Sequence, residues 1–86
     1  MDIRCKDLII TGGENVNPLE VEEALLQIEG ITDAAVIGVE DVEWGEKVVA
    51  YIVNSEFVIR NSELRMKLKG RIPDFKIPNE LIQVFS

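Results

Sequence analysis

The sequence predicts a small α+β protein of one domain, covering residues 1–86, with elements in the order β-β-α-β-β-α-β. The composition, with 47% hydrophobic and 29% charged residues over 86 positions, is typical of a single globular domain. Runs rich in β-branched residues alternate with two stretches whose apolar residues recur every three or four positions, as in strands and helices. A glycine pair closes the first run. We therefore expect an N-terminal hairpin plus a roughly three-stranded sheet, with two helices packed on one face.

The hairpin is predicted from residues 8–16. A short strand is predicted at residues 8–11 and ends at Gly12 and Gly13, and residues 15–16 follow as the return strand. A glycine pair supplies the positive φ angles that tight hairpin turns need, and it also lets a ligand approach the backbone closely. The pair is therefore either a turn alone or a turn that is also part of a site.

The first helix is predicted to begin after Asn17, a favourable N-cap residue, with Pro18 in its first turn. Apolar residues spaced by three and four positions predict a stripe that faces the core. The stripe consists of Val21, Ala24, Leu25 and Ile28. The polar side chains expected to point outward are Glu20, Glu22, Glu23 and Gln27. Gly30 is predicted to end the helix as a left-handed cap.

Two longer strands are predicted in the middle of the chain. Residues 31–39 are rich in β-branched residues, and the nearly continuous apolar run 34–37 favours a strand covered on both faces, or a central one. Residues 40–46 form an acidic loop that holds the single tryptophan, Trp44. Residues 47–53 follow as the second strand, which we expect to be antiparallel to the first because the loop is short.

The C-terminal part is predicted to hold a helix and a last strand. After a connection over residues 54–60, Asn61 or Ser62 is expected to cap the second helix. Its buried stripe consists of Leu64, Leu68 and Ile72. Two prolines bracket residues 74–77, which are therefore not expected to form a helix. Residues 80–85 are predicted to form the last strand.

The charge and cysteine content exclude several classes of function. Nine Lys and Arg residues against sixteen Asp and Glu residues give a net charge of −7. We expect no nucleic-acid partner, because duplex binding needs a basic face. With no histidine and one cysteine, no metal site is expected. That residue, Cys5, excludes an internal disulfide and is typical of a reducing, cytoplasmic compartment. No apolar run approaches the ~20 residues that span a membrane, so no membrane span is expected.

The residues alone indicate a binding or accessory domain and not a complete enzyme. Catalysis normally needs a nucleophile, a base or a metal ion held in a pocket. The chain has no histidine, and Cys5 has no evident base beside it. Asp and Glu residues are plentiful, but charged side chains are usually solvated.

Four motifs follow one another along the whole chain. They are RCKDLIITGGENV at residues 4–16, DAAVIG at 33–38, WGE at 44–46 and FKIP at 75–78. In this order and spacing they resemble the C-terminal domain of the adenylate-forming enzymes, which comprise acyl-CoA synthetases, peptide-synthetase adenylation domains and beetle luciferases. The TGGEN and WGE motifs together are similar to those of the acyl- and aryl-CoA ligase branch.

The resemblance implies a reaction in two steps. Such an enzyme uses ATP and Mg²⁺ to join a carboxylic acid to AMP and releases pyrophosphate. Its small C-terminal domain then rotates, and the thiol of CoA attacks the acyl-adenylate. The implied partners are CoA and a large N-terminal nucleotide-binding domain of the same enzyme. We therefore expect the chain to be part of an ATP-dependent, AMP-forming acid–CoA ligase, and to bind no cofactor by itself.

Four positions match the path that the family provides for CoA. By resemblance, Gly12 and Gly13 line the pantetheine tunnel and Trp44 flanks it. Phe75 is a possible CoA contact. The simpler alternatives are that the glycines only form a turn and that Trp44 only anchors its loop.

Residues 1–7 match the segment around the hinge of the rotating domain. By resemblance, Lys6 occupies the hinge position, and Arg4 lies in the part that approaches the nucleotide ribose. The adenylation lysine that the family carries near its C-terminal end has no counterpart in this sequence. We therefore expect no catalytic residue in the chain, and no activity from the chain alone. Ile77 and Asn79 stand where some members have basic residues for the CoA phosphates.

Two other functions stay open at this point. The chain could be a stand-alone interaction module of the same fold, without catalysis. It could also belong to an adenylation domain that serves a carrier protein instead of CoA. The resemblance does not identify the acid, because acid specificity in this family lies in the large domain.

Overall fold

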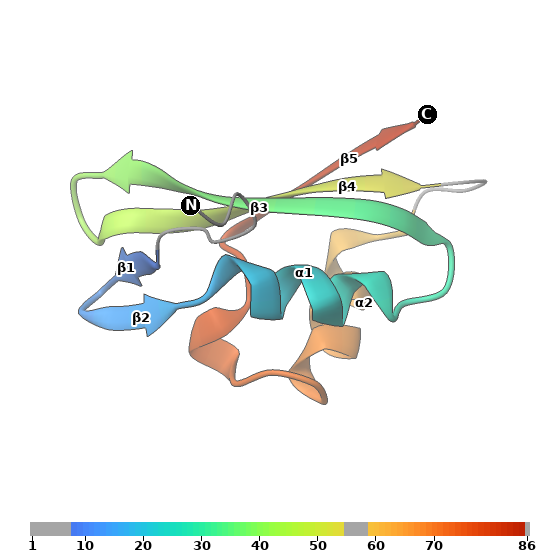
Figure 1. Ribbon diagram of the computed structural model, residues 1–86, viewed down its shortest axis with the longest axis horizontal. Helices are drawn as coiled ribbons and strands as arrows, with labels where there is room; N and C mark the ends of the chain where they lie inside the picture. Colours follow the sequence, from blue (N-terminus) through green and yellow to red (C-terminus); the bar gives the residue numbers. More distant parts are fainter. Residues whose placement is uncertain (1–7, 55–58, 86) are drawn as a thin grey trace, which may run out of the picture.

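The computed structural model describes residues 8–54 and 59–85. In chain order its elements are β1 (Ile9–Thr11), β2 (Glu14–Val16), α1 (Pro18–Leu26), β3 (Ile31–Asp41), β4 (Gly45–Asn54), α2 (Asn61–Lys69), the 3₁₀ helix η1 (Asp74–Lys76) and β5 (Glu80–Phe85). This order confirms the predicted β-β-α-β-β-α-β arrangement. Both α-helices lie on one side of the sheet, as predicted (Figure 1).

The described strands form one five-stranded sheet with β4 at its centre. β4 pairs antiparallel with β3 along most of its length and parallel with β5 from Val49 onward. The β1–β2 hairpin joins this sheet through one antiparallel pair, Thr11 with Gly45. The hairpin is therefore an extension of the sheet, attached at the start of β4.

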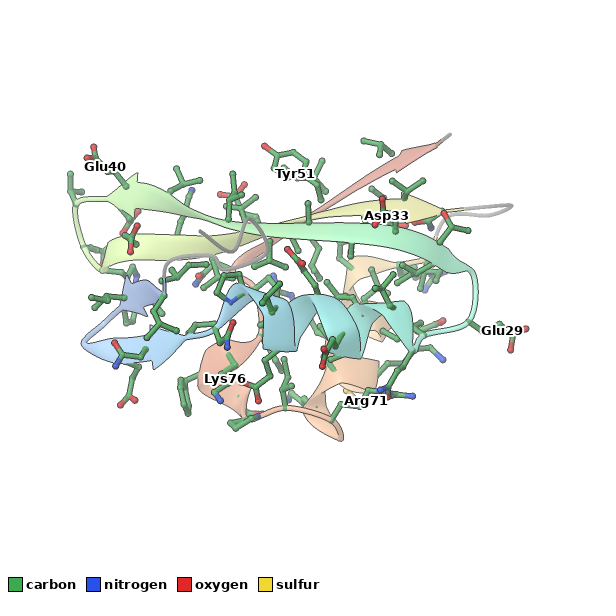
Figure 2. All side chains as sticks on the ribbon, in the orientation of Figure 1. Glu29, Asp33, Glu40, Tyr51, Arg71 and Lys76 are labelled. Atoms are coloured by element: carbon green, nitrogen blue, oxygen red, sulfur yellow. The ribbon has the colours of Figure 1, made fainter. Side chains whose placement is uncertain are left out.

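The position of β3 differs from the prediction. Its apolar run predicted a strand covered on both faces or a central one, but among the described strands β3 lies at an edge of the sheet. Ala35 and Ile37 are exposed, and they pair with Tyr51 and Val49 of β4. Figure 2 shows Tyr51 on the side of the sheet away from the helices. On this outer face the apolar side chains of β3 therefore lie beside those of the neighbouring strand β4 and remain partly exposed.

The core lies between the sheet and the two helices. Alternate residues of β4, namely Val48, Ala50 and Ile52, are fully buried there. Both predicted helix stripes are confirmed as buried. Their members are Val21, Ala24, Leu25, Ile28, Leu64, Leu68 and Ile72. Since burying one Leu or Ile side chain is worth about 1.5–3 kcal/mol, these contacts hold the helices against the sheet.

The start of α1 has the predicted cap. Asn17 is extended, and its Oδ1 accepts a hydrogen bond of 3.0 Å from the N–H of Leu19. Pro18 occupies the first helical turn, where its missing N–H costs nothing. The side chain of Asn17 thus satisfies one of the N–H groups that a helix leaves without an internal partner.

Replacing Asn17 with alanine is expected to lower the free energy of unfolding by about 1 kcal/mol, because that N–H loses its acceptor. Urea unfolding followed by circular dichroism measures the loss. Asn15→Ala is the matched control, since Asn15 lies two residues earlier with an exposed side chain. Equal losses for the two variants would contradict the capping role.

The end of α1 comes earlier than predicted. Gly30 has the predicted positive φ, at 97°, but the helix ends at Leu26 with Gln27 as its C-cap. The N–H groups of Gln27 and Ile28 donate to carbonyl oxygens three residues back, which tightens the last turn. Gly30 instead redirects the chain into β3.

One acidic side chain of α1 does not point outward as predicted. Glu22 is partly buried, and its Oε2 accepts a hydrogen bond of 2.8 Å from the N–H of Val36. The carboxylate thereby occupies a backbone donor on edge strand β3. Covering such donors is one way in which proteins protect sheet edges from further pairing.

The N-cap of α2 is also different from the predicted one. Arg60, and not Asn61 or Ser62, is the cap residue, and it makes no side-chain cap hydrogen bond. Asn61 has other partners: its Nδ2 donates to the carbonyl of Leu81 at 3.1 Å, and its Oδ1 accepts from Gln83 at 2.9 Å. These bonds tie the start of α2 to β5, which a local capping rule does not consider.

Candidate functional site

A groove of about 270 Å³ opens at one end of the sheet. It is enclosed by three segments that are distant in sequence: the β1–β2 turn, the β3–β4 loop and the stretch from η1 to β5. Figure 1 shows β1, β2 and the β3–β4 loop at the same end of the molecule. The residues that line the groove are Thr11, Gly12, Glu14, Trp44, Asp74, Phe75, Ile77 and Asn79.

Gly12 forms the hairpin turn and touches Trp44. Both turn residues have positive φ, 56° at Gly12 and 82° at Gly13, as predicted. The N–H of Gly12 donates to the carbonyl of Trp44 at 2.9 Å. A Cβ atom on Gly12 would lie only 2.8 Å from Cε3 of the tryptophan ring. Glycine is therefore needed here both for the turn and for the close approach of the ring.

Gly13 lies differently from its neighbour. It is not among the residues that line the groove, and a Cβ atom placed on it would meet nothing within 4 Å. The structure therefore brings Gly12 to the groove but not Gly13. A role for Gly13 in a pantetheine tunnel stays a prediction.

Trp44 forms a wall of the groove and is 53% exposed. Its loop is held by Asp41, whose Oδ2 accepts hydrogen bonds from the N–H groups of Glu43 at 3.1 Å and of Trp44 at 3.0 Å. The ring therefore contacts Gly12 on one side and remains accessible on another. Asp41 was not singled out from the sequence, although an aspartate that begins a turn commonly binds backbone N–H groups two or three residues later.

Glu46, the last residue of the WGE motif, makes a second long-range contact near this end of the sheet. Its Oε1 accepts a hydrogen bond of 2.9 Å from the N–H of Ile10 in β1. The contact joins residues 36 positions apart, so no local pattern could indicate it. It joins the hairpin, which carries the groove residues Thr11 and Gly12, to the start of β4.

The wall at Phe75 is built on a turn that the sequence did not predict. The two prolines predict no helix over residues 74–77, but Asp74–Lys76 form one 3₁₀ turn, which is short enough to fit between them. Phe75 is 45% exposed in this turn. Lys76 forms an ion pair of 2.7 Å with Glu20 of α1, and Figure 2 shows Lys76 on the helix side of the sheet.

The segment between η1 and β5 is fixed by α2 and β4. The guanidinium of Arg65 donates to the carbonyls of Pro78 and Asn79, both at 2.7 Å. Asn79 also pairs with Val48 of β4, because its N–H donates to the carbonyl of Val48 at 2.8 Å and its Oδ1 accepts from the N–H of Val48 at 2.9 Å. The floor of the groove is therefore attached to the rigid part of the domain.

The charges around the groove favour a neutral ligand segment. Two carboxylates, those of Glu14 and Asp74, belong to its lining, and the described lining residues include no Lys or Arg. Lys76 lies nearby, with Nζ 5.7 Å from the centre of the Phe75 ring, and is paired with Glu20. Like charges repel, so a phosphate group is disfavoured inside the groove, whereas an uncharged chain is not.

One lysine close in sequence to the groove has a perturbed pKa. The hydrogen bond and charge of the Glu80 carboxylate raise the pKa of Lys47 above its ordinary value, despite a smaller opposing effect of desolvation. This exposed pair links β4 to β5. It lies outside the lining of the groove and therefore concerns strand pairing more than the site.

Residues 20–86 match the protein family described as AMP-binding enzyme C-terminal domain. The chain belongs to this family. The match covers most of the chain and confirms the family that the four motifs indicated.

Two curated relatives are CoA ligases. The 2-succinylbenzoate–CoA ligase of Listeria monocytogenes serotype 4b (strain F2365) is 41% identical over 78 residues, which are 91% of this chain and 16% of the relative. The long-chain-fatty-acid–CoA ligase FadD13 of Mycobacterium tuberculosis (strain CDC 1551 / Oshkosh) is 35% identical over 79 residues, which are 92% of this chain and 16% of the relative. The chain thus spans 16% of the length of these relatives.

A solved structure has the same fold. It is o-succinylbenzoate CoA synthetase (MenE) from Bacillus subtilis in complex with the acyl-adenylate intermediate OSB-AMP. The TM-score is 0.83 and the identity 40%, over 91% of this chain and 16% of that chain. This AMP-binding C-terminal domain is therefore similar to a part of larger adenylate-forming CoA synthetases.

The structure brings together three of the predicted site residues. Gly12, Trp44 and Phe75 line one groove, whereas Arg4 and Lys6 lie outside the described residues. Over residues 8–54 and 59–85, no group of three or more acidic, His or Cys side chains could hold a metal ion. No helix in the same ranges is long and apolar enough to cross a membrane.

Proposed function

We propose that this AMP-binding C-terminal domain works as part of an acyl- or aryl-CoA ligase, in which it forms one wall of the passage for the pantetheine arm of CoA. The observation that carries the proposal is that Gly12, Trp44 and Phe75, each assigned to CoA by its motif, line the same groove. They come from three segments separated by about 30 residues each. A turn residue and two loop anchors with purely local roles would not need to meet.

The proposed enzyme performs two steps with a large N-terminal domain that this chain does not include. In the first step, ATP with Mg²⁺ and a carboxylic acid give an acyl-adenylate and pyrophosphate. In the second step, the thiol of CoA loses its proton to solvent and its sulfur bonds to the acyl carbon. The bond from that carbon to the phosphate oxygen breaks, and AMP leaves. We assign the described residues to the second step, after a rotation of this domain about the segment around Lys6.

The groove fits the middle of CoA better than its ends. The pantetheine arm is an uncharged chain with two amides, and it can lie against aromatic rings without a counter-charge. The carboxylates of Glu14 and Asp74 in the lining disfavour the phosphates of the nucleotide end. By the resemblance, Ile77 and Asn79 stand where some family members have basic residues, which is consistent with phosphates that bind elsewhere.

Replacing Trp44 with alanine in the complete ligase is expected to slow thioester formation and spare acyl-adenylate formation. Loss of the exposed ring face removes packing against the pantetheine arm, worth about 1–2 kcal/mol, or a rate factor of about 5- to 30-fold. Single-turnover kinetics measure the two half-reactions separately. Val42→Ala is the matched control, because Val42 lies in the same loop but is fully exposed and does not line the groove.

A loss confined to the adenylation step would contradict the assignment of Trp44 to the CoA passage. An enzyme that transfers its acyl group to a carrier-bound pantetheine, and not to free CoA, would show the Trp44→Ala loss only with the carrier protein as acceptor. Acid-dependent exchange of pyrophosphate into ATP by the 86-residue chain alone would contradict the division of labour between the two domains.

A further inference from the structure

Glu46 lies in β4, and its side chain binds the hairpin that carries part of the groove lining. β1 pairs with β4 through Thr11 and Gly45. Next to this pair, Glu46 Oε1 accepts the hydrogen bond of 2.9 Å from the N–H of Ile10. The side chain therefore continues, by one more hydrogen bond, a strand pairing that the backbone makes at a single position.

The carboxylate of Glu46 is also confined on its other side. A Cβ atom at Gly38 would lie 2.9 Å from Glu46 Oε2 and 3.0 Å from Cγ2 of Ile9. Gly38 lies on β3, so the carboxylate fits into a space between β3 and β1 that a side chain at position 38 would fill. This explains in physical terms why glycine follows the apolar run of β3.

We propose that Glu46 is a positioning residue for the CoA step, which sets the distance between Gly12 and the Trp44 ring. The inference rests on the proposed function of the groove. Glu46 fixes Ile10, which lies two residues before Gly12, and Gly12 donates to the carbonyl of Trp44 at 2.9 Å. Without the carboxylate, the Thr11–Gly45 pair and the Gly12–Trp44 hydrogen bond still join the hairpin to the start of β4. Because one of the contacts is lost, the hairpin gains freedom to move relative to the Trp44 ring.

Amide hydrogen exchange on the 86-residue chain tests the contact itself. In Glu46→Ala, exchange at Ile10 is expected to rise about tenfold relative to the core amide of Ile52, because a charge-assisted hydrogen bond is lost locally. Glu46→Gln keeps a carbonyl acceptor and is expected to restore most of the protection. Glu43→Ala is the matched control: it removes the same charge beside Trp44, from an exposed side chain, and is expected to leave Ile10 unchanged.

Gly38→Ala perturbs the same contact without changing any charge. The added methyl group crowds the carboxylate, so exchange at Ile10 is expected to rise here too, while the core amides keep their protection. Unchanged exchange at Ile10 in Glu46→Ala overturns the proposal. So does a glutamine variant that protects Ile10 no better than alanine does.

Kinetics of the complete ligase separate a positioning role from a merely structural one. Glu46→Ala is expected to raise the KM for CoA about tenfold and to leave acyl-adenylate formation unchanged, since a groove wall out of place weakens the bound geometry. Faster exchange at Ile10 with an unchanged KM for CoA would overturn the positioning role. This outcome differs from a failure of the proposed function itself. If the groove does not bind CoA, Trp44→Ala also leaves the CoA step unchanged.

Discussion

Gly12→Ala is expected to slow acyl transfer to CoA by about 100-fold in the complete ligase, with acyl-adenylate formation preserved. The new Cβ atom would lie 2.8 Å from Cε3 and 3.0 Å from Cζ3 of Trp44. Real Cβ atoms do not come this close to a ring, so the ring must shift away from Gly12. Displacing a substrate-positioning group by about 1 Å can cost about 100-fold in rate. Single-turnover consumption of acyl-adenylate by CoA measures the effect.

Gly13→Ala separates the close approach from the backbone strain. Gly13 also has positive φ, so alanine there has a similar conformational cost of about 1 kcal/mol. Its Cβ atom, however, would meet nothing within 4 Å. The single tryptophan gives a second measurement. We expect the fluorescence of Trp44 to change in the Gly12 variant and to stay unchanged in the Gly13 variant. Identical losses of the CoA step would instead assign both glycines to the passage.

Local patterns predicted the elements of the fold because their causes are local. The glycine pair gave the turn, Asn17 gave the start of α1, and the spacing of apolar residues gave both buried stripes. Each depends on interactions within about four residues, which is the range that propensity and periodicity describe. These are the features that the structure confirms.

Two errors are local, namely the early end of α1 at Leu26 and the 3₁₀ turn Asp74–Lys76. The others concern groups whose partners are far away in sequence. Asn61 is a typical helix N-cap residue, but its side chain instead donates a hydrogen bond to the carbonyl of Leu81 in β5, 20 residues later. Glu22 has the sequence position of a solvated side chain, but its carboxylate accepts a hydrogen bond from the N–H of Val36 in β3. The apolar run of β3 looks like a central strand, because a run without alternation does not reveal whether cover comes from a second layer or from neighbouring strands.

The candidate site was predictable as a set of residues and not as an arrangement. The motifs named Gly12, Trp44 and Phe75 one by one through the resemblance. Their meeting depends on long-range contacts, such as the ion pair of Lys76 with Glu20, 56 residues apart, and the hydrogen bond from Ile10 to Glu46. Nothing in the spacing of these residues indicates such contacts.

Leu25→Ala is expected to lower the free energy of unfolding by about 2–5 kcal/mol, the largest stability effect among the predictions. Leu25 is fully buried in α1, within the core cluster that also contains Val36 and Ile52 of the sheet. Removing three carbon atoms loses their burial and leaves a cavity that a small core fills only in part. A domain of 86 residues has a total stability of about 4–13 kcal/mol, so this loss is a large share of it.

Leu26→Ala is the matched control in the same helical turn. Leu26 is 44% exposed, and an exposed substitution is expected to cost about 0.5 kcal/mol or less. Urea unfolding of both variants gives the difference directly, and equal losses would mean that α1 does not pack through its predicted stripe.

The Leu25→Ala result also bears on the groove. α1 carries Glu20, which holds Lys76 next to Phe75. If α1 is loosened by Leu25→Ala, the Phe75 wall loses its anchor as well. We therefore expect hydrogen exchange around η1 to rise in this variant before the domain unfolds, and not in Leu26→Ala.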